Sequence, residues 1–149
     1  MDYIDFLRYI LLPILAAIPT IGLIIYVLNR PKRDKRVDGL AQKAYECAAD
    51  IMGVEAKGKP PAVSLKNAPW DNVVGRYTYR RMFGFLWYEQ IEVVDDVSYI
   101  FSNLVHEMTH VLLERAGMTN NEILPEATEA AADKHCAGPE LDELLRKFN

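Results

Sequence analysis

The sequence predicts an α+β domain preceded by one transmembrane helix, and three observations support this class. An uncharged apolar run of twenty residues lies near the N-terminus, at 9–28. A later segment rich in aromatic and β-branched residues lies between two segments with helical hydrophobic spacing, at 38–52 and 96–116. The 149 residues, half of them hydrophobic, suit one small domain with an added segment.

The first element is the apolar run from Tyr9 to Leu28, YILLPILAAIPTIGLIIYVL. At about 1.5 Å per residue, a helix of this length spans roughly 30 Å, the thickness of a bilayer's hydrocarbon core. Its prolines and glycine are tolerated in membrane helices. A signal peptide fits less well, because Asp2 and Asp5 precede the run and no small-residue cleavage site follows it. A buried core helix fits less well because the run has no polar face.

A basic segment, NRPKRDKR, follows the apolar run and holds five basic residues against Asp34. By the positive-inside rule this flank stays in the cytosol, so the chain is expected to be a single-pass membrane protein with a cytoplasmic domain. The expected organisation is an anchor at 1–29, a basic linker at 30–37 and a domain at 38–149. Residues 37–149 carry 18 acidic and 11 basic side chains, a balance that excludes a nucleic-acid partner.

The sequence contains two cysteines, Cys47 and Cys136, and their spacing does not match that of a disulfide-rich scaffold. In a reducing cytosol they are expected to be small buried thiols. A disulfide between them remains the alternative if the domain lies outside the cytosol.

The first half of the domain reads as a helix followed by a small sheet. Asp38 is expected to cap a helix through about Met52, with Gly53 as its stop. A short strand is expected at 62–65, between proline- and glycine-containing segments. The aromatic segment that follows predicts two strands around a turn or bulge near Gly84.

The hydrophobic period then changes to that of a helix, from about Asp96 to Ala116, stopped by Gly117. This helix contains the sequence His106-Glu107-Met108-Thr109-His110. Residues four apart on a helix differ by about 40° around its axis, so both imidazoles point the same way and can reach one metal ion.

Glu107 lies about 100° around the helix from His106, which suits a general base that takes a proton from water better than a ligand. A catalytic zinc site also needs a third protein ligand and an open position. H-E-x-x-H does occur by chance in half-exposed helices. Its place after a sheet and within an apolar helix favours the Zn²⁺ interpretation.

The segment VHEMTH, followed by PEATEAAADKHC, resembles the gluzincin group of zinc metallopeptidases. The resemblance implies that Glu129 is the third zinc ligand and that Asp133, one turn later, accepts the remaining N–H of a zinc-bound histidine. Glu126 is the rival ligand. Positions 113 and 116 lack the glycine and histidine of metzincins, and His135 with Cys136 is turned away from Glu129.

This resemblance implies a small zincin-like fold: an N-terminal helix, a mixed sheet, an active-site helix and a glutamate helix. It also implies hydrolysis of peptide or protein substrates near the membrane, with Glu107 as general base and part of the sheet at 77–94 binding the substrate. Tyr77, Tyr79, Tyr88 or an arginine is expected to stabilise the oxyanion. The alternative is a catalytically idle, membrane-tethered binding or regulatory protein, although the presence of Glu107 favours an enzyme.

Overall fold

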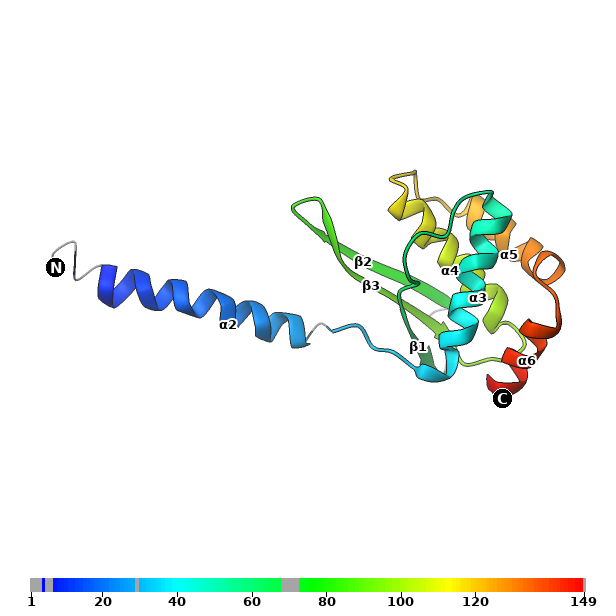
Figure 1. Cartoon of the computed structure of the whole chain (residues 1–149), viewed down its shortest axis with the longest axis horizontal. Coiled ribbons are helices and arrows are strands. Elements are labelled where there is room, and N and C mark those ends of the chain that lie inside the picture. The colour runs from blue at the N-terminus through cyan, green and yellow to red at the C-terminus, as the bar shows by residue number, and fades with distance from the viewer. Residues whose placement is uncertain (1–3, 5–6, 29, 68–72, 149) are drawn as a thin grey trace. The chain divides into compact units, whose positions relative to one another are not determined.

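The computed structural model describes residues 4, 7–28, 30–67 and 73–148, and the chain divides into two compact units, Met1–Pro31 and Lys32–Asn149. The first unit contains the π-helical turn η1 (Leu7–Leu11) and helix α2 (Leu12–Leu28), shown in Figure 1. Together they form one apolar helix, Arg8–Leu28, of 21 residues, long enough to span a membrane and without buried side chains. A signal sequence can have the same length and composition.

The second unit begins earlier than the sequence predicts, because the basic segment is bound to the sheet. The backbone N–H of Lys32 donates to the Gln90 side chain at 2.8 Å, and Gln90 donates back to the Lys32 carbonyl at 2.8 Å. The N–H of Asp34 donates to the carbonyl of Val63 at 2.7 Å. A short 3₁₀ helix, η2 (Lys35–Val37), follows and buries Val37 completely. Residues 32–37 are therefore part of the folded domain.

Helix α3 spans Asp38–Met52, as predicted, and ends at Gly53, whose φ of 66° is readily adopted by glycine. The prediction that Asp38 caps it is wrong. Val37 occupies the cap position, and the Asp38 carboxylate instead accepts from the guanidinium of Arg33 at 2.8 Å. The basic segment, held close by the sheet, competes successfully for this carboxylate.

The predicted strands form one mixed sheet in the order β1-β3-β2. Strand β1 (Ala62–Lys66) pairs parallel with β3 (Phe85–Val94), and β2 (Gly75–Met82) pairs antiparallel with β3. The turn between β2 and β3 consists of Phe83 and Gly84, since Met82 pairs with Phe85. A register shift at 80–81 adds an irregularity, so both the expected turn and a nearby bulge-like feature are present. Among the described strands, β2 forms one edge of the sheet.

Three helices complete the domain: α4 (Ile100–Arg115), α5 (Ile123–His135) and α6 (Pro139–Phe148). Helix α4 packs against β2 and β3, while α3 and α5 pack against α4. Helix α4 begins four residues later than predicted because Asp96 forms a turn in which its side chain accepts the N–H of Ser98. Helix α6, which was not predicted, buries Leu141 and Phe148 against the core. The fold is α+β with one N-terminal apolar helix.

Cys47 and Cys136 form a disulfide, so the expectation of two reduced thiols is wrong. Cys47 lies on the buried face of α3, and Cys136 ends α5. Helices α3 and α5 pack side by side, which brings the two Cα atoms to 6.0 Å across 89 residues of sequence. The disulfide therefore ties the end of α5 to α3.

Candidate metal centre

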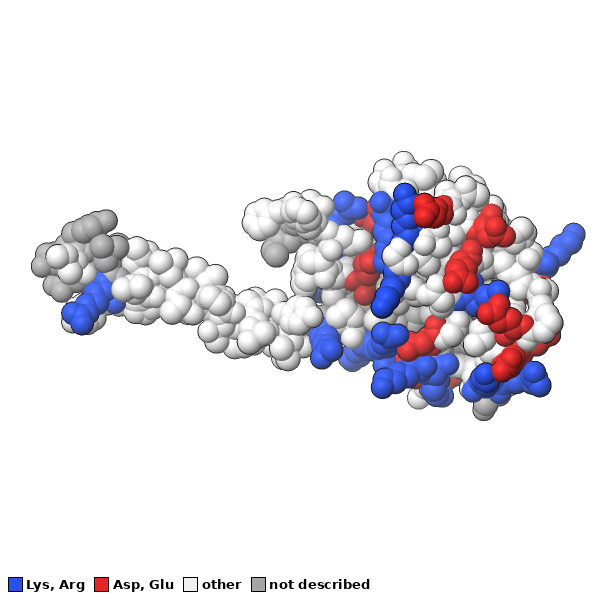
Figure 2. All heavy atoms as spheres, viewed as in Figure 1, with Lys and Arg blue, Asp and Glu red and all other residues white. Residues whose placement is uncertain are grey.

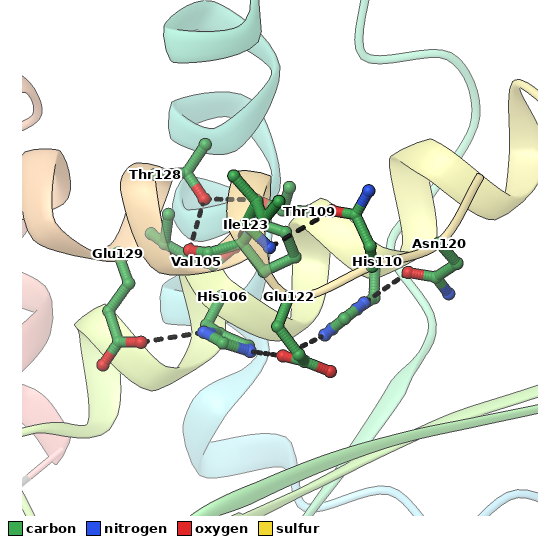
Figure 3. A network of polar contacts seen from close by, with 11 residues as sticks. Val105, His106, Thr109, His110, Asn120, Glu122, Ile123, Thr128 and Glu129 are labelled. Atoms are coloured by element: carbon green, nitrogen blue, oxygen red, sulfur yellow. Dashed lines mark hydrogen bonds and ion pairs between the residues drawn. The ribbon is translucent and has the colours of Figure 1, made fainter. Parts of the chain in front are cut away.

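Two histidines of α4 and one glutamate at the start of α5 converge on one point (Figure 3). The Nε2 atom of His106 lies 3.2 Å from Oε2 of Glu122, and Nε2 of His110 lies 3.4 Å from the same oxygen. The i, i+4 spacing places both rings on one face of α4, as predicted. Glu122 reaches them because it occupies the cap position immediately before α5. These three side chains can hold a metal ion.

The other nitrogen of each ring is held by a hydrogen-bond acceptor. Oε2 of Glu129 lies 2.8 Å from Nδ1 of His106, and the Oδ1 atom of Asn120 contacts Nδ1 of His110. With a metal ion at Nε2 of each ring, Nδ1 would carry the proton and donate it to the carboxylate oxygen of Glu129 or the amide oxygen of Asn120. Glu129 and Asn120 are therefore placed to support the tautomer that metal binding requires, with the lone pair of each ring on Nε2.

Helix α5 is fixed on α4 by a buried polar contact. The hydroxyl groups of Thr109 and Thr128 are 2.7 Å apart and hydrogen-bonded, and both side chains are fully buried. At the far end of α5, His135 pairs with Asp50 of α3 at 2.7 Å, beside the disulfide. Anchoring at the middle and end of α5 holds its first turn, and therefore Glu122, over the histidines.

Glu107 lies behind the histidines, against strand β2, and is 6% exposed. Burial is the largest cause that raises its pKa to about 7, and the nearby Glu122 charge adds to the rise. The N–H of Tyr77 donates to the Glu107 carboxylate and opposes this shift. Gly75 leaves the space that this carboxylate occupies, since a Cβ atom there would lie 2.5 Å from Oε1 of Glu107.

A cavity of about 660 Å³ opens over these groups. Its walls come from the start of β2, the face of α4 that carries the histidines, and the segment around Asn120 and Glu122. Glu107 is thus both buried from bulk solvent and adjacent to a space that admits a ligand. A metal ion between the histidines and Glu122 would face this cavity.

The structure places the remaining predicted residues as follows. Glu129 lies at the site but contacts Nδ1 of His106, which is the position that the resemblance assigned to Asp133. Asp133 and Glu126 are exposed, and within the described part of the chain neither is bonded to His106 or His110. His135 and Cys136 are engaged elsewhere, in the ion pair and the disulfide.

Of the expected oxyanion partners, all three tyrosines are engaged, Tyr79 by a side-chain hydrogen bond to Glu114. The hydroxyl of Tyr77 donates to Glu89 at 2.9 Å, and that of Tyr88 donates to Gln90 at 3.1 Å. Tyr79 and Arg76 line the cavity, as does Asn103, which lies one turn before His106 and is 5% exposed. Arg76 and Asn103 are therefore polar cavity residues that remain as candidates to meet a bound carbonyl oxygen.

Glu122, Asn120 and Gly75 are site residues that sequence reasoning missed. The segment TNNE, just before the glutamate helix, offered a signal for the first two, because polar residues at a helix start near a metal motif are potential ligands. Nothing in the sequence indicated Gly75, whose role depends on the close approach of β2 to α4.

The three donor atoms suit a single metal ion. Two imidazole nitrogens and one carboxylate oxygen lie within 4.8 Å of one another, close enough to share a single ion. Two histidines and one glutamate thus offer three protein ligands, and the adjacent cavity leaves room for a further ligand. Comparison with known protein families, curated proteins and solved structures finds no match for this chain.

Proposed function

We propose that this chain is a membrane-anchored zinc metallopeptidase of the gluzincin-like kind that its motif resembles. One observation carries the proposal: Nε2 of His106, Nε2 of His110 and Oε2 of Glu122 converge beside a cavity whose wall contains the buried carboxylate of Glu107. A structural zinc site is closed by four protein ligands and does not need a buried acid beside the metal. The arrangement therefore supports hydrolysis over metal storage or simple binding.

In this proposal His106, His110 and Glu122 hold the ion, and Glu129 and Asn120 orient the two rings. Zinc in such a site supplies Lewis-acid polarisation of a carbonyl group and makes water more acidic. Glu122 takes the ligand role that the resemblance gave to Glu129. Glu129 then acts through the ring of His106, raising the basicity of its Nε2.

Glu107 serves as the general base. Its buried carboxylate lines the cavity, where it can accept a proton from water and return it to the departing amine. Tyr77 N–H and the wall at Gly75 hold the carboxylate in one position. Preorganisation of this kind is what a proton-transfer group requires.

The edge of the sheet supports a peptide as substrate. Strand β2 pairs with β3 alone among the described strands, and its first residues line the cavity. An extended peptide can pair with the outer edge of β2 and so carry its scissile bond past Glu107. Arg76 and Asn103, which line the cavity, would then face the substrate carbonyl.

The anchor is the apolar helix Arg8–Leu28, and the basic flank after it favours a cytoplasmic domain acting on membrane-proximal proteins. The Cys47–Cys136 disulfide supports the opposite expectation, since such bonds persist in oxidising compartments. Protease added to intact cells distinguishes the two. A cytoplasmic domain leaves residues 37–149 uncut until the cells are permeabilised, whereas an exported domain is digested at once.

The central test compares wild-type protein with Glu107→Gln. Both are expected to bind about one zinc ion per chain, and only wild type is expected to cleave unfolded protein substrates. Glu126→Gln, an exposed change on α5, is the control and should cleave as wild type does. Equal cleavage by Glu107→Gln and wild type would overturn the mechanism.

A further inference from the structure

A buried amide side chain, that of Asn103, lies in the wall of the cavity. Asn103 is 5% exposed, and on α4 it precedes His106 by three residues and Glu107 by four. Residues at these spacings are neighbours on the surface of a helix, with Cβ atoms about 5–6 Å apart. The amide therefore lies one helical turn from both His106 and Glu107.

The Asn103 side chain has no hydrogen-bond partner among the described residues. Its backbone N–H donates to the carbonyl of Tyr99, as the helix requires, but the side-chain amide makes no such contact in that part of the chain. Within the same residues, every fully enclosed side-chain nitrogen or oxygen has a partner. The unpaired amide is therefore not enclosed, and it opens to the cavity that Asn103 lines.

The chemistry of this amide defines the group that it can bind best. A carboxamide has two N–H donors and an acceptor oxygen. A carbonyl oxygen pairs only with the donors, whereas a hydroxyl or a second carboxamide pairs with the donor and the acceptor sides together. An apolar group would cover the amide and leave it unpaired, which is costly at a buried position. The amide therefore favours a ligand that both donates and accepts.

The sheet directs substrate side chains, more than the substrate backbone, to this amide. The face of the sheet towards α4 carries Glu89, which pairs with Arg115 of α4. Gly75 of β2 opens to the same side, where Glu107 fills the space beside it. A peptide added to the outer edge of β2 continues the sheet, so alternate side chains point to the side of α4. These side chains enter the cavity whose wall includes Asn103.

Charge does not favour a different kind of side chain. Acidic and basic residues are interspersed on the face of the globular unit that Figure 2 draws, so their fields largely offset one another there. Within the cavity, the nearby carboxylates of Glu122 and Glu129 disfavour an acidic group. A charged group at the depth of Asn103 would lose its water without gaining an opposite charge from the amide.

We propose that Asn103 determines specificity by hydrogen-bonding a hydroxyl or carboxamide side chain of the substrate. This inference rests on the proposed peptidase function. The separation of about 5–6 Å between neighbours on α4 is less than two residues of an extended peptide, so the bound side chain belongs to a residue that flanks the scissile bond. The enzyme then favours serine, threonine, asparagine or glutamine at that position.

The test compares the zinc-loaded full chain with Asn103→Leu, which keeps a side chain of similar size and removes the amide. Asn67→Leu changes an exposed asparagine that does not line the cavity and is the matched control. Each protein digests a mixed library of unfolded peptides, and mass spectrometry identifies the cleaved bonds. Wild type and the control should cleave beside the four polar residues, and Asn103→Leu should cleave beside apolar ones.

Matched peptides make the comparison quantitative. Two peptides of about ten residues are identical except that both central residues are threonine in one and valine in the other. Wild type should show kcat/KM about 10- to 100-fold higher for the threonine peptide, because valine leaves the amide unpaired. Asn103→Leu should lose or reverse this ratio, with unchanged zinc content. A merely structural role would lower kcat/KM for both peptides equally.

The affinity of the zinc-loaded Glu107→Gln chain for the same two peptides gives a readout without turnover. Tighter binding of the threonine peptide, abolished by adding Asn103→Leu, supports the role of Asn103 even if wild type cleaves nothing and the peptidase proposal fails. Cleavage without a polar preference, or with a preference that Asn103→Leu leaves unchanged, overturns the role of Asn103 alone.

The remaining outcomes are equally decisive. A preference of wild type for basic or apolar residues also overturns the role of Asn103. Neither cleavage nor binding of any peptide overturns both proposals. Asn103→Ala removes the amide without adding volume, and it replaces Asn103→Leu if leucine lowers the thermal midpoint.

Discussion

Replacement of Gly75 by alanine should separate metal binding from catalysis. Gly75 touches neither histidine nor Glu122 in the described contacts, but its missing side chain leaves room for Glu107. A Cβ atom at this position would lie 2.5 Å from Oε1, 3.0 Å from Cγ and 3.1 Å from Cδ of Glu107. Because ordinary contacts begin at 3.4 Å, the whole end of the side chain must move.

The required displacement is close to 1 Å, and a misplacement of about 1 Å in a catalytic group can reduce the rate about 100-fold. Alanine fits the strand backbone, because the φ of Gly75 is outside the positive range. We therefore expect kcat for hydrolysis of an unfolded protein substrate to fall about 100-fold while the zinc dissociation constant stays within about threefold.

Gly138→Ala is the matched control, since a Cβ atom at Gly138 meets nothing within 4 Å. It should leave kcat, zinc affinity and thermal midpoint unchanged. Full activity in Gly75→Ala would refute the assignment of Glu107 as a base held against β2. Loss of zinc together with activity would show instead that the alanine disturbs the ligands.

Three further predictions follow from the site and the fold. Glu122→Gln should weaken zinc binding by more than about 100-fold and Glu129→Gln by only about 10- to 100-fold, measured by competition with a chelator; the reverse order would make Glu129 the ligand. Burial raises the pKa of Glu107 from 4.5 to about 7, so the metal-free folded chain binds more protons than the unfolded chain in that window. Its free energy of unfolding in urea should therefore fall by up to about 3 kcal/mol as pH rises from about 4.5 to 7, and Glu107→Gln should remove that part of the slope. Replacing both Cys47 and Cys136 by serine should lower the free energy of unfolding by about 2–4 kcal/mol, because the disulfide closes a loop of 89 residues; an unchanged value would mean that the cysteines are not paired.

Local patterns predicted most of the fold. Hydrophobic spacing identified the helices around Leu40 and Leu104, and aromatic and β-branched residues identified the strands, because both depend on neighbours a few positions away. The helix ends were predicted less well. The start of α4 depends on the turn made by Asp96, and the cap of α3 depends on where the sheet holds Arg33.

The candidate site was likewise predictable only in part. The pairing of His106 with His110 follows from helix geometry alone, so it could be predicted. The third position could not, because Glu122 and Glu129 are seven residues apart and lie on nearly the same side of α5. Only the packing of α5 on α4, set by Thr109 and Thr128, decides which carboxylate meets Nε2 of the ring and which meets Nδ1.

The sequence left the disulfide as an alternative and did not decide it, for a similar reason. Cys47 and Cys136 are 89 residues apart, and their pairing depends on the packing of α3 against α5. The expected compartment, inferred from the basic flank, had favoured free thiols. A pairing that is set by tertiary packing cannot be read from charge or composition.

The most direct test of the central claim is a crystal structure of the zinc-loaded chain with anomalous data collected on both sides of the zinc edge. The account predicts one strong peak bonded to Nε2 of His106, Nε2 of His110 and a carboxylate oxygen of Glu122, with Glu107 outside the coordination shell and the cavity adjoining the open position. No zinc peak between these residues, or a peak ligated by Glu129 with Glu122 turned away, would contradict it.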